Sequence, residues 1–315
     1  MRLPVNLAPG CSTIGIDMAS MRFINAHRTL ATGLIAICAI TLTGIAALLG
    51  VSEWKLRRTH DVPLTPLDTG HGSVDYAEGE RLSRIVGRWA GCHGMTGQGG
   101  SVDMDGYYSV AAPSLSAAIS DYSDPELARL IRFGIKRDGR SALGMISYTF
   151  YPLSDEDLFN IIAHLRNQPP HPTATRRKSI TAVARFELAI GKWQVAADQV
   201  DATRPRWGER PRTTAFERGR YLASITCSEC HGVDFRGNEF KDNTYDGGPS
   251  LAIIARYGRD ECRHLMRTGE PIGARDLGEM SWVARNGFVH FTDQEIDDIR
   301  SFLREYHGLP EEPQK

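Results

Sequence analysis

The chain contains an internal repeat, and this repeat limits its fold more than any other feature of the sequence. Residues 74–170 and 214–309 carry the same features in the same order: an opening aromatic residue, Cys-His-Gly, Pro-Ser-Leu, a short helical segment, a methionine and a closing helical segment. From His93 to Met145 is 52 positions, and from His231 to Met280 is 49. Since chance rarely matches six features in order, we expect two copies of one small domain.

Within each copy the apolar residues recur at the spacing of a helix. These residues are Leu127, Leu130, Ile131, Leu158, Ile161, Ile162 and Leu165 in the first copy, and Cys262, Leu265, Met266, Ile296, Ile299, Phe302 and Leu303 in the second. Ser154 and Thr292 precede the closing segments as N-caps, with an acidic residue three positions later. Strand alternation and hairpin turn signals are not prominent. The sequence therefore predicts an all-α fold.

An apolar segment precedes the repeat. Its 24 residues, 29–52, carry no charge and as a helix reach roughly 36 Å, enough to cross a bilayer. No small-residue cleavage signal follows, so we predict an uncleaved transmembrane anchor rather than a removed signal peptide or a buried core helix. Residues 1–28 form a leader in which Met21 is an alternative start, and residues 53–73 form a stalk. Basic residues flank the anchor on both sides, so charge alone leaves its orientation open.

The two copies are joined by a basic linker, residues 171–213. It carries nine basic and four acidic residues, a net charge of +5, and includes an apolar stretch from Phe186 to Trp193. Two interpretations are open: a strap across both domains, or a segment that contacts an anionic membrane surface or partner. The whole chain has a formal net charge of -1, which argues against a nucleic-acid-binding function. Residues 310–315 form a short C-terminal tail.

The second copy contains the motif Cys227-Ser-Glu-Cys230-His231. Two thiols three positions apart on one helical turn suit thioether bonds to the two vinyl groups of haem, and the adjacent histidine then faces the iron. A thioredoxin-like redox pair needs a βαβ context, and half of a zinc site needs another Cys/His pair nearby. The sequence shows neither. We therefore predict covalent haem c on Cys227 and Cys230, with His231 as the proximal iron ligand.

The first copy departs from this motif. It reads Trp89-Ala-Gly-Cys92-His93, with tryptophan where the first cysteine is expected. A single thioether from Cys92 and an iron bond from His93 would still hold a haem. The alternative is a decayed repeat that keeps its fold without haem, with Trp89 filling space in the core. Because this copy retains a methionine at the matching distance, we expect two haems per chain.

The sixth iron ligand should be a soft, neutral donor far along the chain. Met145 and Met280 lie in Gly-containing segments that we expect to be loops just before the last helix of each copy. Three other methionines are poorer candidates, because they follow the first histidine too closely or fall on a helix face: Met95, Met104 and Met266. His/Met ligation saturates the iron, and a saturated iron favours electron transfer over catalysis.

These motifs resemble bacterial membrane-anchored dihaem c-type cytochromes and the cytochrome subunits that accept electrons from membrane-bound alcohol and sugar dehydrogenases. The resemblance covers about residues 50–309, including the juxtamembrane segment Val51–Pro63. It implies a class I cytochrome c fold for each copy, in which the carbonyl groups of Pro113 and Pro249 accept a hydrogen bond from the proximal histidine. It also implies haem attachment outside the cytoplasm, and therefore a bacterial inner-membrane protein with its haem domains in the periplasm.

The resemblance further implies an electron carrier without catalytic residues of its own. Its partners would be a dehydrogenase or quinol-linked donor and a respiratory acceptor such as another cytochrome or an oxidase. The third haem motif of the longest dehydrogenase subunits is absent from this sequence. Two other functions are open. One is a dihaem peroxidase-type enzyme, which needs a displaceable sixth ligand, and the other is a haem-based sensor or assembly module whose first domain is structural only.

Overall fold

A computed structural model of the chain describes residues 18–69, 73–86, 89–94, 96–104, 108–169, 171, 179–238 and 247–309. Most of the predicted leader, the predicted tail and Met95 lie outside the described residues. The chain divides into two compact units, residues 1–51 and 52–315. The first unit contains nearly all of the predicted anchor, and the second contains both copies of the repeat with the linker.

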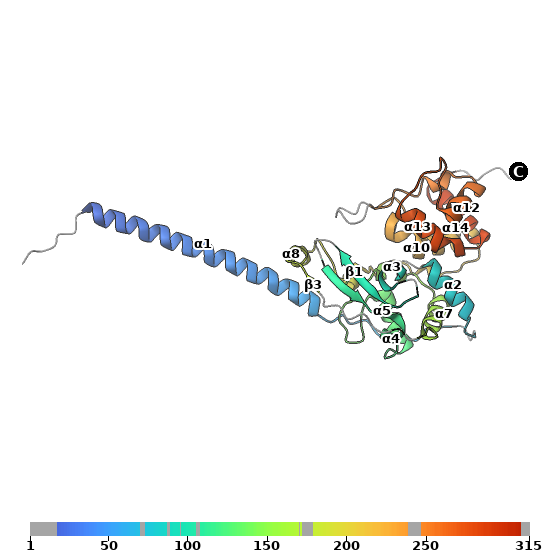
Figure 1. Cartoon of the computed structure of the whole chain (residues 1–315), viewed down its shortest axis with the longest axis horizontal. Coiled ribbons are helices and arrows are strands. Elements are labelled where there is room, and N and C mark those ends of the chain that lie inside the picture. Colours follow the sequence, from blue (N-terminus) through green and yellow to red (C-terminus); the bar gives the residue numbers. More distant parts are fainter. Residues whose placement is uncertain are drawn as a thin grey trace, which may run out of the picture. The chain divides into compact units, whose positions relative to one another are not determined.

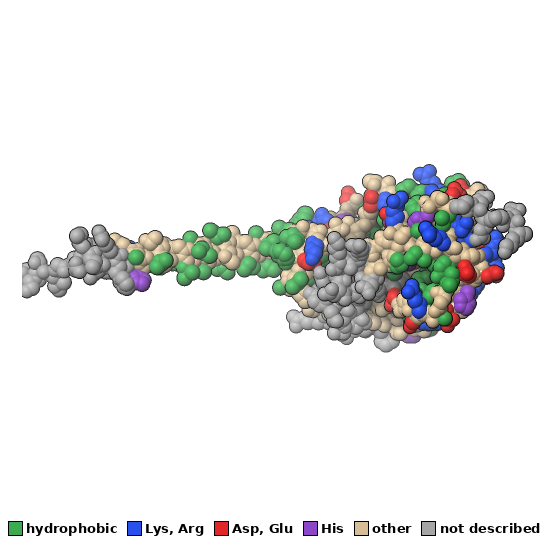
Figure 2. Space-filling model, turned by 90° about the horizontal axis from the view of Figure 1, so that it is seen from above, with side chains coloured by type: hydrophobic (Ala, Val, Ile, Leu, Met, Phe, Trp, Pro, Cys, Tyr) green, Lys and Arg blue, Asp and Glu red, His purple; other side chains and the backbone are tan. Residues whose placement is uncertain are grey.

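The predicted anchor lies in one long helix. Helix α1 (Met18–Arg57) has 40 residues (Figure 1), and its segment Asn25–Arg57 is the one helix among the described residues that is long and apolar enough to cross a membrane. Hydrophobic side chains line this helix on its outside (Figure 2), and no part of its apolar window is buried. This exposure excludes a buried core helix. The helix continues past the predicted end of the span at Ser52, so its last turn occupies the start of the predicted stalk.

The second unit is mostly helical, as predicted. The helices of the first copy are α2 (Tyr76–Ile85), α3 (Trp89–His93), α4 (Leu115–Ala118), α5 (Asp124–Phe133), α6 (Ser147–Phe150) and α7 (Asp155–Arg166). Those of the linker are α8 (Ala182–Ile190), α9 (Ala196–Gln199) and the 3-10 turn η1 (Trp207–Glu209). Those of the second copy are α10 (Ala215–Thr226), α11 (Ser228–His231), η2 (Ile254–Arg256), α12 (Arg259–Thr268), α13 (Glu279–Asn286), η3 (Phe288–His290) and α14 (Asp293–Tyr306).

Each copy is built on a close crossing of its first and last helices. Helix α2 packs against α7, and α10 packs against α14. The crossing points are Gly79 and Gly219, which occupy matching positions in the two repeated sequences. A Cβ atom at Gly79 would collide with the backbone oxygen of Asn160, and one at Gly219 with that of Asp298. Both crossings therefore require glycine, because a larger side chain would push the two helices apart.

The predicted apolar faces form the core of the unit. The buried members are Leu127, Leu158, Ile161, Ile162 and Leu165 in the first copy, and Cys262, Leu265, Met266, Ile296, Ile299, Phe302 and Leu303 in the second. Burial raises the pKa of the Cys262 thiol to about 12, so this cysteine is neutral and behaves as a small apolar residue. The caps are also present: Ser154 accepts a hydrogen bond from the backbone of α7, and Thr292 forms a full capping box with Glu295.

A small antiparallel sheet departs from the all-α prediction. Strand β1 (Gly100–Met104) pairs with β2 (Tyr108–Ala112), and β2 pairs with β3 (Ser179–Ile180). In the register of the first pair, Val102 lies opposite Val110. The strands are short and mix small and polar residues around these valines, so their pattern cannot be told from that of a loop. The β1–β2 pair lies within the first copy, and the β2–β3 pair joins the first copy to the linker.

The linker contacts both copies. The Gly208 N–H donates to the carbonyl oxygen of Pro152 over 2.9 Å, and the Arg204 guanidinium donates to the carbonyl oxygen of Val233 over 3.0 Å. Several of its basic residues are engaged in ion pairs within the unit: Arg185 with Glu53, Lys192 with Glu187, Arg206 with Asp155, and Arg212 with Asp157. These contacts support the strap interpretation for residues 179–213.

A buried tyrosine joins the two copies. Tyr221 of α10 accepts a hydrogen bond from the backbone N–H of Ser154 over 3.2 Å and donates one to the carboxylate of Asp157, at the N-terminus of α7. Burial and the Asp157 carboxylate raise the pKa of Tyr221, so its hydroxyl stays protonated and acts as the donor. Arg212 covers the ring of Tyr221 at 4.6 Å and pairs with Asp157 at 3.2 Å. The cluster ties the first helix of one copy to the last helix of the other.

An ion pair provides a second link between the copies. Arg81 of α2 bonds the carboxylate of Glu295, in the first turn of α14, at 2.8 Å. Arg81 is also held by Glu78 of its own helix at 2.7 Å. Since these side chains are partly exposed, the pair contributes less than about 1 kcal/mol, and the buried tyrosine cluster is the stronger of the two links.

Tyr221→Phe is expected to lower the free energy of unfolding by about 1.5–3 kcal/mol, because it removes a hydrogen bond to a charged group and leaves the buried N–H of Ser154 without its acceptor. Urea unfolding of the detergent-solubilised chain measures this change. Tyr76→Phe, at an exposed tyrosine of α2, is the matched control and should shift stability by less than about 0.5 kcal/mol. Equal unfolding midpoints for the two variants would contradict the role given to the Tyr221 hydroxyl.

Candidate haem sites

In the second copy, the Cys-X-X-Cys-His motif begins where α10 ends. Cys227 is the C-cap of α10 and directly precedes α11. The His231 N–H donates to the carbonyl oxygen of Cys227 over 3.0 Å, which closes one turn of helix around the motif. Cys227 and His231 are buried, and Cys230 is half-buried. Both cysteines and the histidine therefore lie on one short turn, the arrangement that haem attachment needs.

The imidazole of His231 is held by one hydrogen bond. Its Nδ1 lies 2.6 Å from the carbonyl oxygen of Pro249. Because a carbonyl only accepts, Nδ1 carries the proton and Nε2 keeps its lone pair. Burial lowers the pKa of His231, and the bond to Pro249 raises it less. The ring is therefore neutral at physiological pH, with its Nε2 in the state that binds a metal.

Two glycines that follow the motif in sequence bond its backbone. The Gly237 N–H donates to the carbonyl oxygen of His231 over 3.0 Å, and the Gly248 N–H donates to that of Cys230 over 2.7 Å. A Cβ atom at Gly248 would lie 2.6 Å from Nδ1 of His231. Gly248 thus permits the backbone approach that places Pro249 on the imidazole. Sequence reasoning missed this residue, although the pair Gly247-Gly248 directly before the proline was a usable signal.

The Cys227 thiol bears on the redox interpretation of the motif. Burial raises the pKa of Cys227 to about 11, so this thiol is protonated near neutral pH. A thioredoxin-like pair depends instead on a thiol of lowered pKa. Within the described residues, no group of three or more His, Cys, Asp or Glu side chains could hold a metal ion. The raised pKa of Cys227 therefore argues against a redox dithiol at this turn.

The first copy repeats this geometry. Nδ1 of His93, on α3, lies 2.8 Å from the carbonyl oxygen of Pro113, and burial lowers the pKa of His93 as it does in the second copy. The Gly99 N–H donates to the carbonyl oxygen of His93 over 2.7 Å. This bond matches the one that Gly237 makes to the second histidine, six positions later in both copies. The first histidine is thus oriented in the same way although its motif lacks a cysteine.

The residues that precede His93 are Trp89 to Cys92, and the backbone of Gly100 packs closely against Cys92. Cys92 is half-buried, and a Cβ atom at Gly100 would lie 2.8 Å from its carbonyl oxygen. For Trp89 the structure describes the backbone, which begins α3. The alternative in which Trp89 fills core space concerns its side chain, which lies outside the described part of the chain.

The two candidate methionines lie at the edge of the core. Met145 and Met280 are both partly buried and contact the core cluster. Met145 lies in an irregular segment, as predicted, but the short helix α6 separates this segment from the last helix, α7. Met280 differs from the prediction, because it lies in the first turn of α13 rather than in a loop. Gly278, with a φ of 60°, turns the chain before this extra helix, and the Ser281 hydroxyl bonds both the Leu277 N–H and the Gly269 carbonyl group there.

No protein-family profile matches this chain, but several curated proteins are similar to it. The fructose dehydrogenase cytochrome subunit of Gluconobacter japonicus is 24% identical over 297 residues, covering 85% of this chain and 59% of that protein. The gluconate 2-dehydrogenase cytochrome c subunit of Pantoea cypripedii is 25% identical, over 72% of this chain and 58% of that protein. Homologues of this chain are thus cytochrome c subunits of dehydrogenases. A quinone alcohol dehydrogenase subunit of this kind from Gluconobacter oxydans is 22% identical over 73% of this chain.

These homologues confirm the resemblance predicted from the sequence and imply covalently bound haem c as the cofactor. The chain spans somewhat more than half the length of these relatives. The residues of the second copy fit the cofactor: two thiols on one turn, and a buried neutral imidazole whose Nε2 is left to bind iron. In the first copy the imidazole and one thiol fit in the same way.

Gly248→Ala is expected to remove most of the haem attached to the second copy, because the added methyl group displaces Pro249 from His231 and misdirects the imidazole. Haem-stained gels and the intact mass of the purified chain measure the loss. Gly91→Ala, where the added atom has no neighbour within 4 Å, is the control and should keep its haem. Full haem content in Gly248→Ala with unchanged helix content would contradict the role of this close approach.

Proposed function

We propose that this chain is a membrane-anchored c-type cytochrome that carries single electrons from a dehydrogenase or quinol-linked donor to a respiratory acceptor. One observation carries the proposal: in both copies the histidine of the Cys-His pair is held through Nδ1 by a proline carbonyl group, with His231 buried, His93 half-buried and the pKa of both lowered by burial. This arrangement leaves Nε2 of each ring to bind a haem iron. The dehydrogenase cytochrome subunits among the homologues support the same function.

The residues that would hold the two haems follow from the motifs. Cys227 and Cys230 would form the thioethers of the second haem, with His231 and Met280 on its iron. Haem c, when bound, supplies an iron that gains and loses one electron. The protein holds the imidazole neutral and at a fixed orientation, and it excludes water from the histidine by burial.

For the first copy we propose a haem with a single thioether, from Cys92, and with His93 and Met145 as axial ligands. The support is the matching hydrogen bond to Pro113 and the matching glycine contact on the histidine. A repeat that kept its fold alone would not need its imidazole neutral and oriented by a carbonyl group. The tandem arrangement of two cytochrome c domains, at 74–170 and 214–309, belongs to the same proposal.

The location and partners are part of the proposal. We place the anchor in a bacterial inner membrane with the haem domains in the periplasm, where c-type haem is attached. The homologues are named as subunits of fructose, gluconate and alcohol dehydrogenases, so a dehydrogenase is the proposed electron donor. Another cytochrome or an oxidase is the proposed acceptor.

Haem counting tests the proposal most directly. The purified chain is expected to carry two covalent haems, seen as the intact mass of the chain plus two haem masses, and as a split α-band because a single-thioether haem keeps one vinyl group. Cys92→Ser is expected to release the first haem. His231→Ala is expected to remove the histidine ligand of the second haem iron. One haem per chain of the two-thioether type alone would show that the first copy is empty. No haem at all would overturn the proposed function.

Met280→Ala is expected to lower the midpoint potential of the second haem by on the order of 100 mV, because a thioether ligand favours the reduced iron. Spectroelectrochemical titration of the chain measures the potential. Met266→Leu is the control, since this methionine is buried in the core and its substitution conserves volume. An unchanged potential in Met280→Ala would remove this residue as a ligand, and an open sixth position in the unmodified chain would favour a peroxidase-type enzyme.

A further inference from the structure

Helix α8 of the linker presents an apolar face to the outside of the unit. Val183, Phe186 and Ile190 are 56%, 50% and 55% exposed, and their spacing of three and four positions places them on one side of the helix. The opposite side carries Ala184 and Leu188, which are fully buried. A helix of a water-soluble surface normally carries charged and polar residues on its outer side, so this face is unusual for its position.

The charged side chains of α8 do not interrupt this face. Arg185 pairs with Glu53 at 2.8 Å, and Glu187 is buried and pairs with Lys192 at 2.5 Å. Both charges therefore point to partners within the unit. The exposed arc of the helix consists of apolar side chains only, with Ala182 beside the three large ones. An arc of this kind binds an apolar surface and not water.

The position of α8 indicates what this surface is. Lys55, near the end of α1, donates from Nζ to the carbonyl oxygen of Leu188 over 2.8 Å. Lys55 follows the last uncharged residue of the predicted span, Ser52, by three positions, so it lies within about 5 Å of the end of that span along the helix. Trp54, between them, is 58% exposed. Tryptophan at this place is typical of the boundary between lipid tails and water.

We propose that α8 is an interfacial helix, whose Val183, Phe186 and Ile190 insert between the lipid headgroups at the outer end of the transmembrane anchor, with Trp54 beside them. The inference rests on the proposed membrane anchoring of α1. The contacts of α8 favour lipid over a protein partner. Arg185 of α8 pairs with Glu53, and Lys55 bonds the carbonyl oxygen of Leu188. Since residues 53 and 55 stay at the membrane boundary while the span crosses the bilayer, α8 stays there with them.

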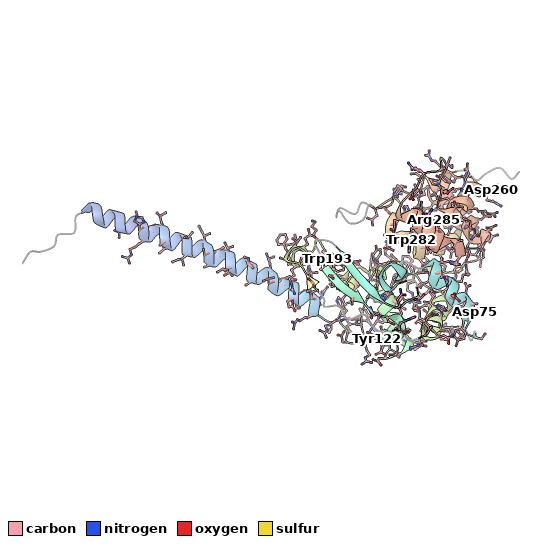
Figure 3. All side chains as sticks on the ribbon, in the orientation of Figure 1. Asp75, Tyr122, Trp193, Asp260, Trp282 and Arg285 are labelled. Atoms are coloured by element: carbon pink, nitrogen blue, oxygen red, sulfur yellow. The ribbon has the colours of Figure 1, made fainter. Side chains whose placement is uncertain are left out.

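The consequence is that the haem-carrying unit is held to the membrane at two places, by α1 and by α8. The end of α8 is tied to the first copy: Trp193, labelled in Figure 3, stacks on Tyr108 of β2 with ring centroids 5.5 Å apart. Through this contact an interfacial α8 limits the rotation of the first copy about the anchor. It therefore restricts which face of the unit is presented to a membrane-bound partner.

Photochemical labelling from the lipid tests the inference. The full haem-loaded chain is reconstituted alone in nanodiscs of phosphatidylethanolamine and phosphatidylglycerol, with a fraction of lipid that carries a diazirine at the glycerol end of its acyl chain. After illumination and digestion, mass spectrometry locates the lipid adducts. Adducts are expected in residues 29–52 and on α8. The loop at Ile272, which is 60% exposed on the second copy, should remain unlabelled.

Two variants provide the comparison. Phe186→Glu is expected to lower the number of lipid adducts on α8 about tenfold, because it replaces an aromatic side chain inserted in the lipid by a carboxylate. Ile272→Glu makes the same kind of change at an exposed apolar residue elsewhere and should leave α8 labelling unaltered. Both changes are on the surface, so unchanged haem spectra are expected to show that each variant is folded.

The outcomes separate this inference from the proposal on which it rests. Adducts in residues 29–52 without adducts on α8 would overturn the interfacial helix and leave the anchor intact. Absence of adducts from both segments would overturn the anchor as well. Cross-linking of α8 to another protein subunit in native membranes, without lipid adducts, would show that a protein covers this face and would equally overturn the inference.

Discussion

The close crossing of the first and last helix of each copy is the constraint on which the rest of the unit depends. At Gly79 and Gly219 the two backbones approach so closely that no side chain fits between them. The crossing positions the end of the first helix, and in the second copy that end is Cys227. The Cys-X-X-Cys-His motif therefore begins at a place that the packing of the helices determines, and the N–H groups of Gly237 and Gly248 bond its backbone.

The first copy lacks one cysteine of the motif, but the contacts that orient the histidine are the same in both copies. Each histidine is bonded through Nδ1 to a proline carbonyl group and accepts a glycine N–H at its own carbonyl oxygen. Since none of these contacts involves the first cysteine of the motif, replacing it by Trp89 leaves the orientation of His93 unaffected. Orientation of the histidine thus does not depend on the first cysteine of the motif.

The contacts between the copies explain why the second unit is compact across two repeats. Tyr221 is buried between them, and Asp157, which it bonds, is also paired with Arg212 of the linker. The linker thereby takes part in the cluster that joins the two copies, in addition to linking them along the chain. Four of its nine basic residues form ion pairs inside the unit, namely Arg185, Lys192, Arg206 and Arg212. The exposed side of α8 is apolar.

The sequence by itself determined the local features: the repeat, the helices with their caps, the apolar span, and the Cys, His and Met residues at haem spacing. These depend on periodicity and on short motifs, which are readable within a few turns of helix. The tertiary structure decided the small sheet, the inclusion of Met280 in the first turn of α13, the approach of Gly248 to His231, the placing of Tyr221 and the outward face of α8. Apart from the β1–β2 pair, each of these depends on which distant segments meet. The pair Gly247-Gly248 signals a close backbone approach, but neither it nor Tyr221 indicates which partner folding brings against it.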